Sequence, residues 1–422
     1  MKRYRIGRAA LATMMSLALG LGVTACSRDY TVAFVYATSA QGGGVSAFNV
    51  DFQSGSLVQI AGSPFTSGMR NPVTLVVAPN QTATTTTPAD NNSGKFLYVI
   101  GGNQDDAVAE MAIGTDGKLF GQHTYNITGH GPTAAAIDPS GHFLYVTFTF
   151  QSGYTTASPG PGGVTIFPIN ADNSLGAPTT VNVGNNPVGV VASARNNFVY
   201  VLDADVTPGG VGNGQILGFS QNPTTGALTP VAGTVITTVG TKTVATGVSA
   251  GTTPTAIAEE QTARFVYVTD RGLNQMLGYQ VTGANSPASG ALVPLVSNPF
   301  ITGQYPVAIT IEPRGKFIYV ANFGSSTISS YAIDPASGNP SGVAGTGNSQ
   351  VSTGPTCVTI EPALGIYLFA STQLSGQISG AQLDPHTGAL TTIENSPFDA
   401  GPLLSCAAAA ANGEHSSSLV NP

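Results

Sequence analysis

One imidazole, two carboxylates and two guanidinium groups are the side chains of this sequence that could combine a general base with a stabiliser of negative charge. His130, with Asp203 or Asp270, could act as a general base. Arg70 or Arg271 could stabilise the negative charge that develops on the carbonyl oxygen. The same residue types are common in turns and on soluble surfaces. Because only 8% of the residues are charged, we favour that structural role over a catalytic cluster.

These residues lie in the loops of a sequence repeat. Seven segments open with a proline, 47 to 67 residues apart: Pro72, Pro132, Pro187, Pro254, Pro306, Pro355 and Pro402. Each continues as an apolar strand, a polar turn and a strand built around Tyr-Val, as in residues 303–322 (GQYPVAITIEPRGKFIYVAN). Pro313 and Gly315 argue against an amphipathic helix there. A period near 50 with several short strands is typical of a β-propeller with one four-stranded sheet per copy.

The two ends of the repeat region predict how the ring closes. The first Tyr-bearing strand, residues 33–38, has no proline-led strand before it, and the last proline-led segment, residues 402–411, has no Tyr-Val strand after it. We therefore expect an all-β, seven-bladed propeller with four antiparallel strands per blade, in which N- and C-terminal strands share one blade. The Thr- and Val-rich segment 234–248 is expected to form an enlarged outer hairpin.

Strand direction predicts which face binds a ligand. The loops before the prolines and after the Tyr-Val strands should share one face, which we call the loop face. The Pro-Arg-Gly and Asp-Pro-x-x-Gly turns should share the other, the turn face. Ligands favour the mouth of a channel, so we expect the site on the loop face. Besides the groups above, the expected ligand-face residues are Asn71, Asn186, Gln304, Tyr305 and Asn322. No Asp-rich loop or paired-histidine spacing indicates a metal, and we expect no cofactor.

The first 26 residues are predicted to be a lipoprotein signal. Lys2, Arg3, Arg5 and Arg8 precede an apolar stretch, and residues 23–26 (VTAC) match a bacterial lipoprotein cleavage box. An ordinary cleaved signal with an incidental cysteine is the alternative. Lipidation at Cys26 would tether an exported protein to the membrane of the cell envelope, on the periplasmic or outer-surface side. The predicted divisions are the signal (1–26), the propeller (27–411) and a tail (412–422).

Charge and cysteine content narrow the partners. The net charge is −7 and no Lys/Arg cluster follows the leader, which excludes a nucleic-acid partner. Cys357 and Cys406 fall in neighbouring proline-led strands, where a disulfide is conceivable in an oxidising compartment. They follow their prolines by two and four residues, so their depths should differ, and we predict free thiols.

The repeat resembles the seven-bladed lactonase family, which includes 6-phosphogluconolactonase-type and carboxy-muconate-cyclising enzymes and the Tyr-Val-Thr-Asn repeat proteins of cell surfaces. The matching motifs are residues 265–270 (FVYVTD), 317–322 (FIYVAN) and 384–390 (DPHTGAL), within a resemblance that covers residues 30 to about 411. The resemblance implies a His directly after the blade-opening proline. Those positions read Val73, Thr133, Val188, Thr255, Val307, Thr356 and Leu403, and none is histidine.

Two functions follow from this pattern. The first is a membrane-tethered binding or scaffolding module whose channel mouth holds a small molecule or a protein. The alternative is an active lactonase on a sugar-derived or aromatic lactone. The missing histidines and the lipid anchor favour the first, and the few cations at the mouth argue against a phosphorylated substrate. The absence of metal-ligand spacing and of Trp disfavours a redox or quinone-dependent dehydrogenase.

Overall fold

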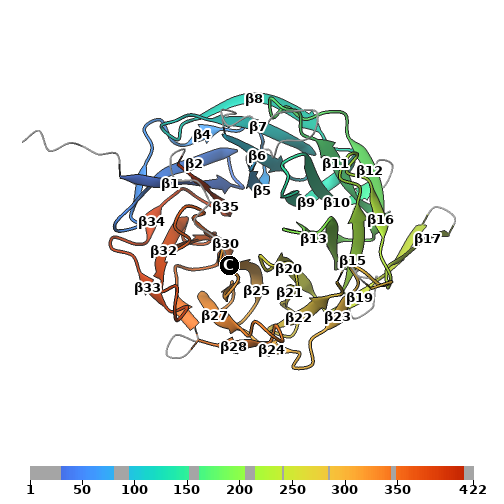
Figure 1. The fold of residues 1–422 in the computed structure, drawn as a ribbon. Helices are drawn as coiled ribbons and strands as arrows, with labels where there is room; N and C mark the ends of the chain where they lie inside the picture. The colour runs from blue at the N-terminus through green and yellow to red at the C-terminus, as the bar shows by residue number, and fades with distance from the viewer. Residues whose placement is uncertain are drawn as a thin grey trace, which may run out of the picture.

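The computed structural model describes residues 30–79, 95–151, 161–204, 214–239, 242–283, 286–343 and 348–412. Every named element in these ranges is a β-strand, and seven antiparallel sheets stand as blades around a central channel (Figure 1). The predicted seven-bladed propeller is confirmed. The predicted signal, residues 1–26, and residues 413–422 of the predicted tail lie outside the described residues. Within the described ranges, no helix is long and apolar enough to cross a membrane.

Each blade starts at the channel, and we number the blades from the one that contains β1. The innermost strands of blades 1 to 7 are β35 (Leu404–Ala411), β5 (Pro72–Val77), β9 (Gly129–Ile137), β13 (Pro187–Ala192), β20 (Pro254–Glu259), β25 (Pro306–Ile311) and β30 (Pro355–Ile360). The second strands are β1 (Thr31–Ser39), β6 (Lys95–Gly101), β10 (Phe143–Gln151), β14 (Phe198–Asp203), β21 (Phe265–Asp270), β26 (Phe317–Asn322) and β31 (Tyr367–Thr372).

The outer half of the blades is less regular than the inner half. The third strands are β2 (Gly44–Asp51), β7 (Ala107–Ile113), β11 (Gly162–Pro168), β15 (Gly214–Gln221), β22 (Gln275–Val281), β27 (Thr327–Ile333) and β32 (Gln377–Leu383). Blades 2 and 3 have one continuous outer strand, β8 (Leu119–Asn126) and β12 (Thr179–Gly184).

In the other five blades the outer strand is broken into two short pieces that pair with the same third strand. The pieces are β3 (Leu57–Gln59) with β4 (Phe65–Thr66), β16 (Leu228–Pro230) with β19 (Val248–Gly251), β23 (Leu292–Pro294) with β24 (Phe300–Ile301), β28 (Pro340–Gly342) with β29 (Asn348–Gln350), and β33 (Leu390–Thr392) with β34 (Phe398–Asp399). Between β16 and β19, β17 (Val235–Val239) and β18 (Lys242–Thr246) form the predicted outer hairpin.

The closing blade is shared by the two ends of the chain, as predicted. β35 pairs antiparallel with β1, so Ala411 lies opposite Ala33 at the turn-face end and Leu404 lies opposite Ser39 at the loop-face end. The sequence predicted Pro402 as the blade-opening residue of this copy, and that position is wrong by two residues. Pro355 pairs with the last residue of β31, and the residue that pairs with the last residue of β1 is Leu404 rather than Pro402.

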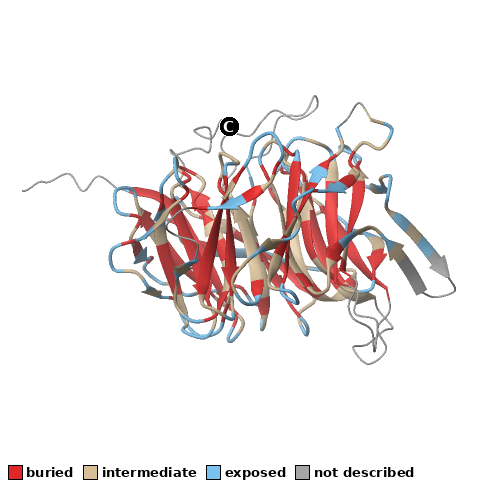
Figure 2. Ribbon diagram, turned by 90° about the horizontal axis from the view of Figure 1, so that it is seen from below, coloured by how far each residue is buried: buried red, intermediate tan, exposed pale blue. Residues whose placement is uncertain are grey.

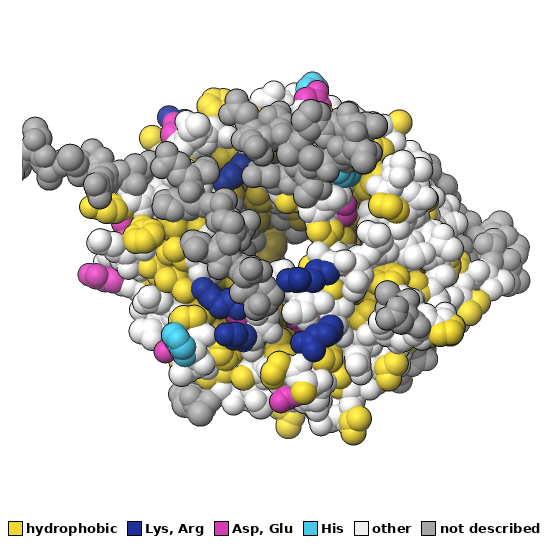
Figure 3. Space-filling view, in the orientation of Figure 1, with side chains coloured by type: hydrophobic (Ala, Val, Ile, Leu, Met, Phe, Trp, Pro, Cys, Tyr) yellow, Lys and Arg dark blue, Asp and Glu magenta, His cyan; other side chains and the backbone are white. Residues whose placement is uncertain are grey.

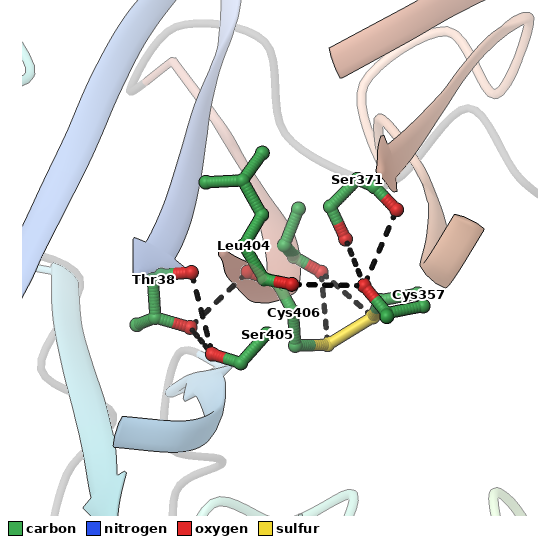
Figure 4. Close-up of a disulfide and its surroundings, with 8 residues drawn as sticks. Thr38, Cys357, Ser371, Leu404, Ser405 and Cys406 are labelled. Carbon is green, nitrogen blue, oxygen red and sulfur yellow. Dashed lines mark hydrogen bonds between the residues drawn. A yellow bond between two sulfur atoms is a disulfide. The ribbon is translucent and has the colours of Figure 1, made fainter. Parts of the chain in front are cut away.

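This shift corrects the prediction of free thiols. With Leu404 in the blade-opening position, Cys406 stands at the same depth as Cys357, and the two form a disulfide with Cα atoms 4.9 Å apart (Figure 4). Beside it, the Thr356 hydroxyl donates to the Leu404 carbonyl at 3.2 Å. The bond joins β30 of blade 7 to β35 of blade 1, where the two ends of the chain complete the ring.

Tyrosines in the second strands explain the Tyr-Val repeat, because each one bonds the next blade. Tyr267 is fully buried and its hydroxyl donates to the Gly338 carbonyl at 2.6 Å. The same bond recurs from Tyr36 to Gly117, Tyr98 to Asn173, Tyr145 to Gly226, Tyr200 to Gly290 and Tyr319 to Gly388. In blade 7 the equivalent residue is Phe369, and the Tyr367 hydroxyl, from a position two residues earlier, donates to the Gln53 carbonyl. Buried strands form the interior of every blade (Figure 2), and the apolar cores lie between neighbouring blades.

Candidate functional site

The channel opens on the loop face into a cavity of about 450 Å³ that blades 2 to 6 line together. Its walls include the side chains that follow the blade-opening prolines, namely Val73, Thr133, Val188, Thr255 and Val307. Polar side chains reach it from the neighbouring loops: Asn186, Thr253 and Arg271. A cavity of this size, mostly apolar with a few polar groups, is typical of a small-molecule site.

Arg271 brings a positive charge to this cavity. It directly follows β21, and its backbone N–H donates to the Thr253 carbonyl at 3.0 Å, which fixes the start of the loop. The residue is exposed, and among the described residues no carboxylate forms an ion pair with its guanidinium. Arg271 is therefore free to bind an anion or a carbonyl oxygen in the cavity.

His130 is held by a carboxylate from the neighbouring blade. Its Nδ1 lies 2.6 Å from Oδ2 of Asp106, which comes from the loop after β6, while Oδ1 of Asp106 accepts the Gly131 N–H at 2.9 Å. The imidazole lies against the Phe150 ring, with centroids 5.7 Å apart, and 40% of its side chain is exposed. His130 stands two residues before Pro132, which lines the cavity. A carboxylate on Nδ1 leaves Nε2 as the nitrogen that can exchange protons.

Asp203 and Asp270 hold the pre-proline loops in place. Both are fully buried at the ends of β14 and β21. Asp270 accepts the N–H groups of Thr252, Thr253 and Gly272 at 2.8 to 3.1 Å and the amide of Gln275 at 3.0 Å. Asp203 accepts the Asn186 N–H at 2.8 Å. These hydrogen bonds give both carboxylates a structural role, and the carboxylate that contacts His130 is Asp106.

The remaining predicted residues are spread around the loop face. Arg70 is exposed, and its backbone N–H and that of Asn71 donate to Asp105 Oδ2. Asn186 lines the cavity, while Asn322 is fully buried and its amide donates to Thr327 and Ser329. Gln304 and Tyr305 are exposed in one pre-proline loop. Cys26 lies outside the described residues. No three His, Cys, Asp or Glu side chains in the described ranges are grouped to hold a metal ion.

Glu259, on the turn face, is the titratable group that sequence reasoning missed. It ends β20 of blade 5 and reaches into blade 4, where it accepts the Ser193 hydroxyl at 2.8 Å and the Ala194 N–H at 2.7 Å. Burial raises its pKa to about 7. The corresponding residues of the next two copies are Ile311 and Ile360, so comparing the copies position by position would have shown the exception.

The turn face also carries most of the positive charge near the channel. Arg195, Arg264, Arg314 and Lys316 belong to the turns that join the first and second strands of blades 4, 5 and 6. Figure 3 shows Lys and Arg side chains gathered around the channel on this side, over β20, β21 and β25. Arg314 pairs with buried Glu312 at 3.3 Å, and Arg264 donates to the Pro335 carbonyl, so these two side chains help to fix the turns.

Comparison with known proteins agrees with the fold and points to one family. A family model described as "Lactonase, 7-bladed beta-propeller" matches residues 213–360. The chain is 24% identical to the 6-phosphogluconolactonase of Yersinia enterocolitica over 317 residues, 74% of this chain and 84% of the relative. The corresponding Yersinia pestis protein is 24% identical over 313 residues, 73% of this chain and 83% of the relative.

Two solved structures share the architecture. One is the periplasmic gluconolactonase of Pseudomonas aeruginosa, with a TM-score of 0.66, 18% identity, and coverage of 90% of this chain and 99% of that one. The other is a protein from Lactobacillus plantarum, with a TM-score of 0.62, 15% identity, and coverage of 89% and 98%. At these identities the likeness establishes the fold alone.

Proposed function

We propose that this chain belongs to the lactonase-like family of seven-bladed propellers and hydrolyses a lactone at the loop-face mouth of its channel. The observation that carries the proposal is the His130–Asp106 pair, two residues from a cavity that also contains Arg271. A base with a fixed orientation and a separate cation are the two groups that attack of water on an ester carbonyl requires.

The reaction can be written with these residues alone. His130 Nε2 takes a proton from a water molecule, whose oxygen attacks the lactone carbonyl carbon. Asp106 stabilises the imidazolium that forms, and Arg271 stabilises the oxyanion. The C–O bond of the ring then breaks, and the imidazolium returns its proton to the departing alkoxide. The product is a hydroxy acid, which ionises in water.

Proton release from a panel of neutral and acidic lactones tests this proposal. We expect His130→Gln and Arg271→Gln each to lower kcat/KM by about 100-fold or more, and Asp106→Asn to lower it by about tenfold. The matched control is His386→Gln. His386 also pairs with an aspartate, Asp384 at 3.6 Å, but on the turn face. Equal losses in His130→Gln and His386→Gln, or turnover that survives Arg271→Gln, would contradict the assignment.

A binding module without turnover is the second candidate. It is favoured by the commitment of Asp203 and Asp270 to main-chain hydrogen bonds, which leaves few ionisable groups at the mouth. Saturable binding of lactones to folded protein without proton release would support this candidate over the hydrolase.

We also propose that lipid at Cys26 tethers the ring with its mouth directed away from the membrane. The Tyr30 carbonyl accepts the Phe52 N–H, and the Thr31 carbonyl accepts the side-chain amide of Asn412, so the described chain starts at the turn face. Four residue steps separate Cys26 from Tyr30, a reach of at most about 14 Å. Cys26→Ala should move the protein from the membrane to the soluble fraction. An unchanged membrane fraction would exclude this anchor.

A further inference from the structure

We infer that the loop-face site takes lactones with an apolar alkyl or aryl body rather than phosphorylated or polyhydroxylated ones. This inference rests on the proposed function, because it names the substrate class of the same site. Three observations support it: the hydrogen bonding of the cavity threonines, the exposed apolar residues of the loop face, and the single guanidinium in the cavity.

The hydroxyl groups of the threonines in the cavity wall are hydrogen-bonded to other groups of the protein. The Thr133 hydroxyl donates to the Pro187 carbonyl of the next blade at 2.7 Å and lies 2.8 Å from the Thr147 hydroxyl. The Thr255 hydroxyl makes the matching contacts, with the Pro306 carbonyl and with Thr269, both at 2.8 Å. A hydroxyl has one proton to donate, so neither threonine has one left for a ligand.

What the wall offers a ligand is therefore mostly hydrocarbon. Val73, Val188 and Val307 occupy the equivalent positions of the blades between and beside these threonines. A sugar ring placed against such a wall would lose hydrogen bonds to water without replacing them, whereas an alkyl or aryl ring would gain from burial. The residues after the blade-opening prolines, which alternate between Val and Thr from blade 2 to blade 6, therefore form a mostly apolar wall in the folded ring.

The loop face carries exposed apolar side chains, which we call the rim, and two of them come at some cost in backbone conformation. Tyr305 and Leu403 immediately precede the innermost strands of blades 6 and 1, at φ of 53° and 48°. In blades 3 and 7 the same position is Gly131 and Gly354, with φ of 67° and 72°. Side chains at such angles are disfavoured relative to glycine. Yet Tyr305 is 55% exposed and Leu403 41% exposed, so burial in the ring does not account for these residues.

Two further apolar side chains extend this rim. Leu273 and Leu374, in the loops after β21 and β31, are both more than half exposed. Leu374 and Leu403 line a second cavity on this face, between blades 7 and 1. Exposed apolar residues gathered on one face mark a binding surface more often than isolated ones do. Strain that the fold tolerates at a loop position is also common at ligand sites. Both observations suit a ligand whose body is apolar.

The single positive charge in the cavity also argues against a phosphorylated ligand. A phosphate monoester carries close to two negative charges at neutral pH and is bound by several cationic or amide donors. Arg271 is the single Lys or Arg among the described residues that line the cavity. One guanidinium suits one carbonyl oxygen or one carboxylate, and the remainder of the ligand must then be compatible with valine and methyl groups.

Two measurements on the purified protein test the inference separately from catalysis. The first compares kcat/KM for 3,4-dihydrocoumarin and δ-decalactone with that for glucono-δ-lactone and its 6-phosphate. The second measures equilibrium binding of 3,4-dihydroquinolin-2-one, the lactam of the aryl lactone, which resists hydrolysis. We expect the apolar lactones to be preferred by at least tenfold and the lactam to bind.

The double variant Tyr305→Gly/Leu403→Gly removes the rim with little risk to the fold, because glycine occupies this position in two other blades. We expect its lactam affinity to fall about tenfold with stability unchanged or higher. The control is Val296→Ser, a fully exposed apolar residue on the outer edge of blade 5. Unchanged affinity in the double variant, or an equal loss in the control, would overturn the role of the rim.

The outcomes separate the two proposals. Lactam binding without hydrolysis of any lactone would support the apolar class and overturn the hydrolase. Turnover of the gluconolactones in preference, without lactam binding, would overturn the apolar class and keep the hydrolase. Absence of both binding and turnover from folded protein would overturn both.

Discussion

Both faces of the ring use buried or half-buried carboxylates to hold their loops, but they depart from the repeat in different ways. On the turn face, the innermost strands of blades 3, 5, 6 and 7 are followed by an acidic residue that folds back on its own turn: Asp138, Glu260, Glu312 and Glu361. On the loop face, Asp105, Asp203 and Asp270 bond the N–H groups of the pre-proline loops. These residues are the shared framework.

The departures distinguish the two faces. On the turn face the exception is Glu259, which supplies from blade 5 the carboxylate that blade 4 lacks, because Ser193 stands at that position. It restores the framework. On the loop face the exceptions are the His130–Asp106 pair, the left-handed Tyr305 and Leu403, and the unpaired Arg271. They add groups that the framework does not need. Departures of the second kind are the better guide to a site.

The largest effect is expected from a glycine in a turn of the turn face. Gly338 has a φ of 72°, and a Cβ there would overlap the buried Phe265 ring of the preceding blade. Gly338→Ala should lower the free energy of unfolding by about 3 kcal/mol or more. Gly354→Ala on the loop face meets Leu374, an exposed side chain that can move, and should lose only about 1 kcal/mol. Urea unfolding measures both, and a larger loss at Gly354 would contradict the comparison.

Removal of the disulfide tests whether it helps to close the ring near the loop face. Cys357→Ala/Cys406→Ala opens a covalent bond between residues 49 apart, and we expect it to lower the free energy of unfolding by about 2 to 4 kcal/mol. A dithiol should have the same effect on the wild-type protein and none on the variant. A variant as stable as the oxidised wild type would show that strand pairing alone closes the ring.

Substitution of Asp270 tests whether this carboxylate only holds the loop or also takes part in catalysis. In Asp270→Asn the amide cannot accept all of the N–H groups that the carboxylate accepts, so stability should fall by about 2 kcal/mol. Glu312→Gln on the turn face is the matched control, because Glu312 also accepts two main-chain N–H groups. Turnover per folded molecule should be similar in the two variants. A loss specific to Asp270→Asn would return this residue to the catalytic set.

The effect of Glu259 should be visible only as a pH dependence of stability. Its pKa is raised in the folded state from 4.5 to about 7, so the native protein favours the protonated form. Glu259 therefore contributes its full stability below pH 4.5 and loses it as the pH rises through 7, by about 1 to 3 kcal/mol. Glu259→Gln should flatten this dependence and be more stable than wild type at pH 8. Glu394→Gln, an exposed carboxylate, is the control. A pH profile unchanged in Glu259→Gln would contradict the assignment.

The strongest sequence signals were those that recur in every copy. The Tyr-Val strands predicted seven blades because the packing of one blade on the next uses the same buried aromatic ring each time, with a hydroxyl in all blades but the seventh, where Phe369 stands. Register was harder to predict where a copy is unusual. Pro402 resembles the other prolines, but pairing with β1 places Leu404 in their position, and the error propagated to Cys406. The partner of His130 was equally out of reach, because Asp106 belongs to another blade.

The sequence alone determined the number of blades and the shared closing blade, because spacing and strand alternation are local properties of the chain. It also predicted the loop face as the face of the site, which stays a prediction. Only the tertiary structure decided that Cys357 meets Cys406, that Asp106 rather than Asp203 or Asp270 contacts His130, and that the Thr133 and Thr255 hydroxyls donate to carbonyls of the next blade. Each of these is a contact between blades. Such contacts depend on register and on the orientation of hydrogen bonds across the interface, which a single sequence does not specify.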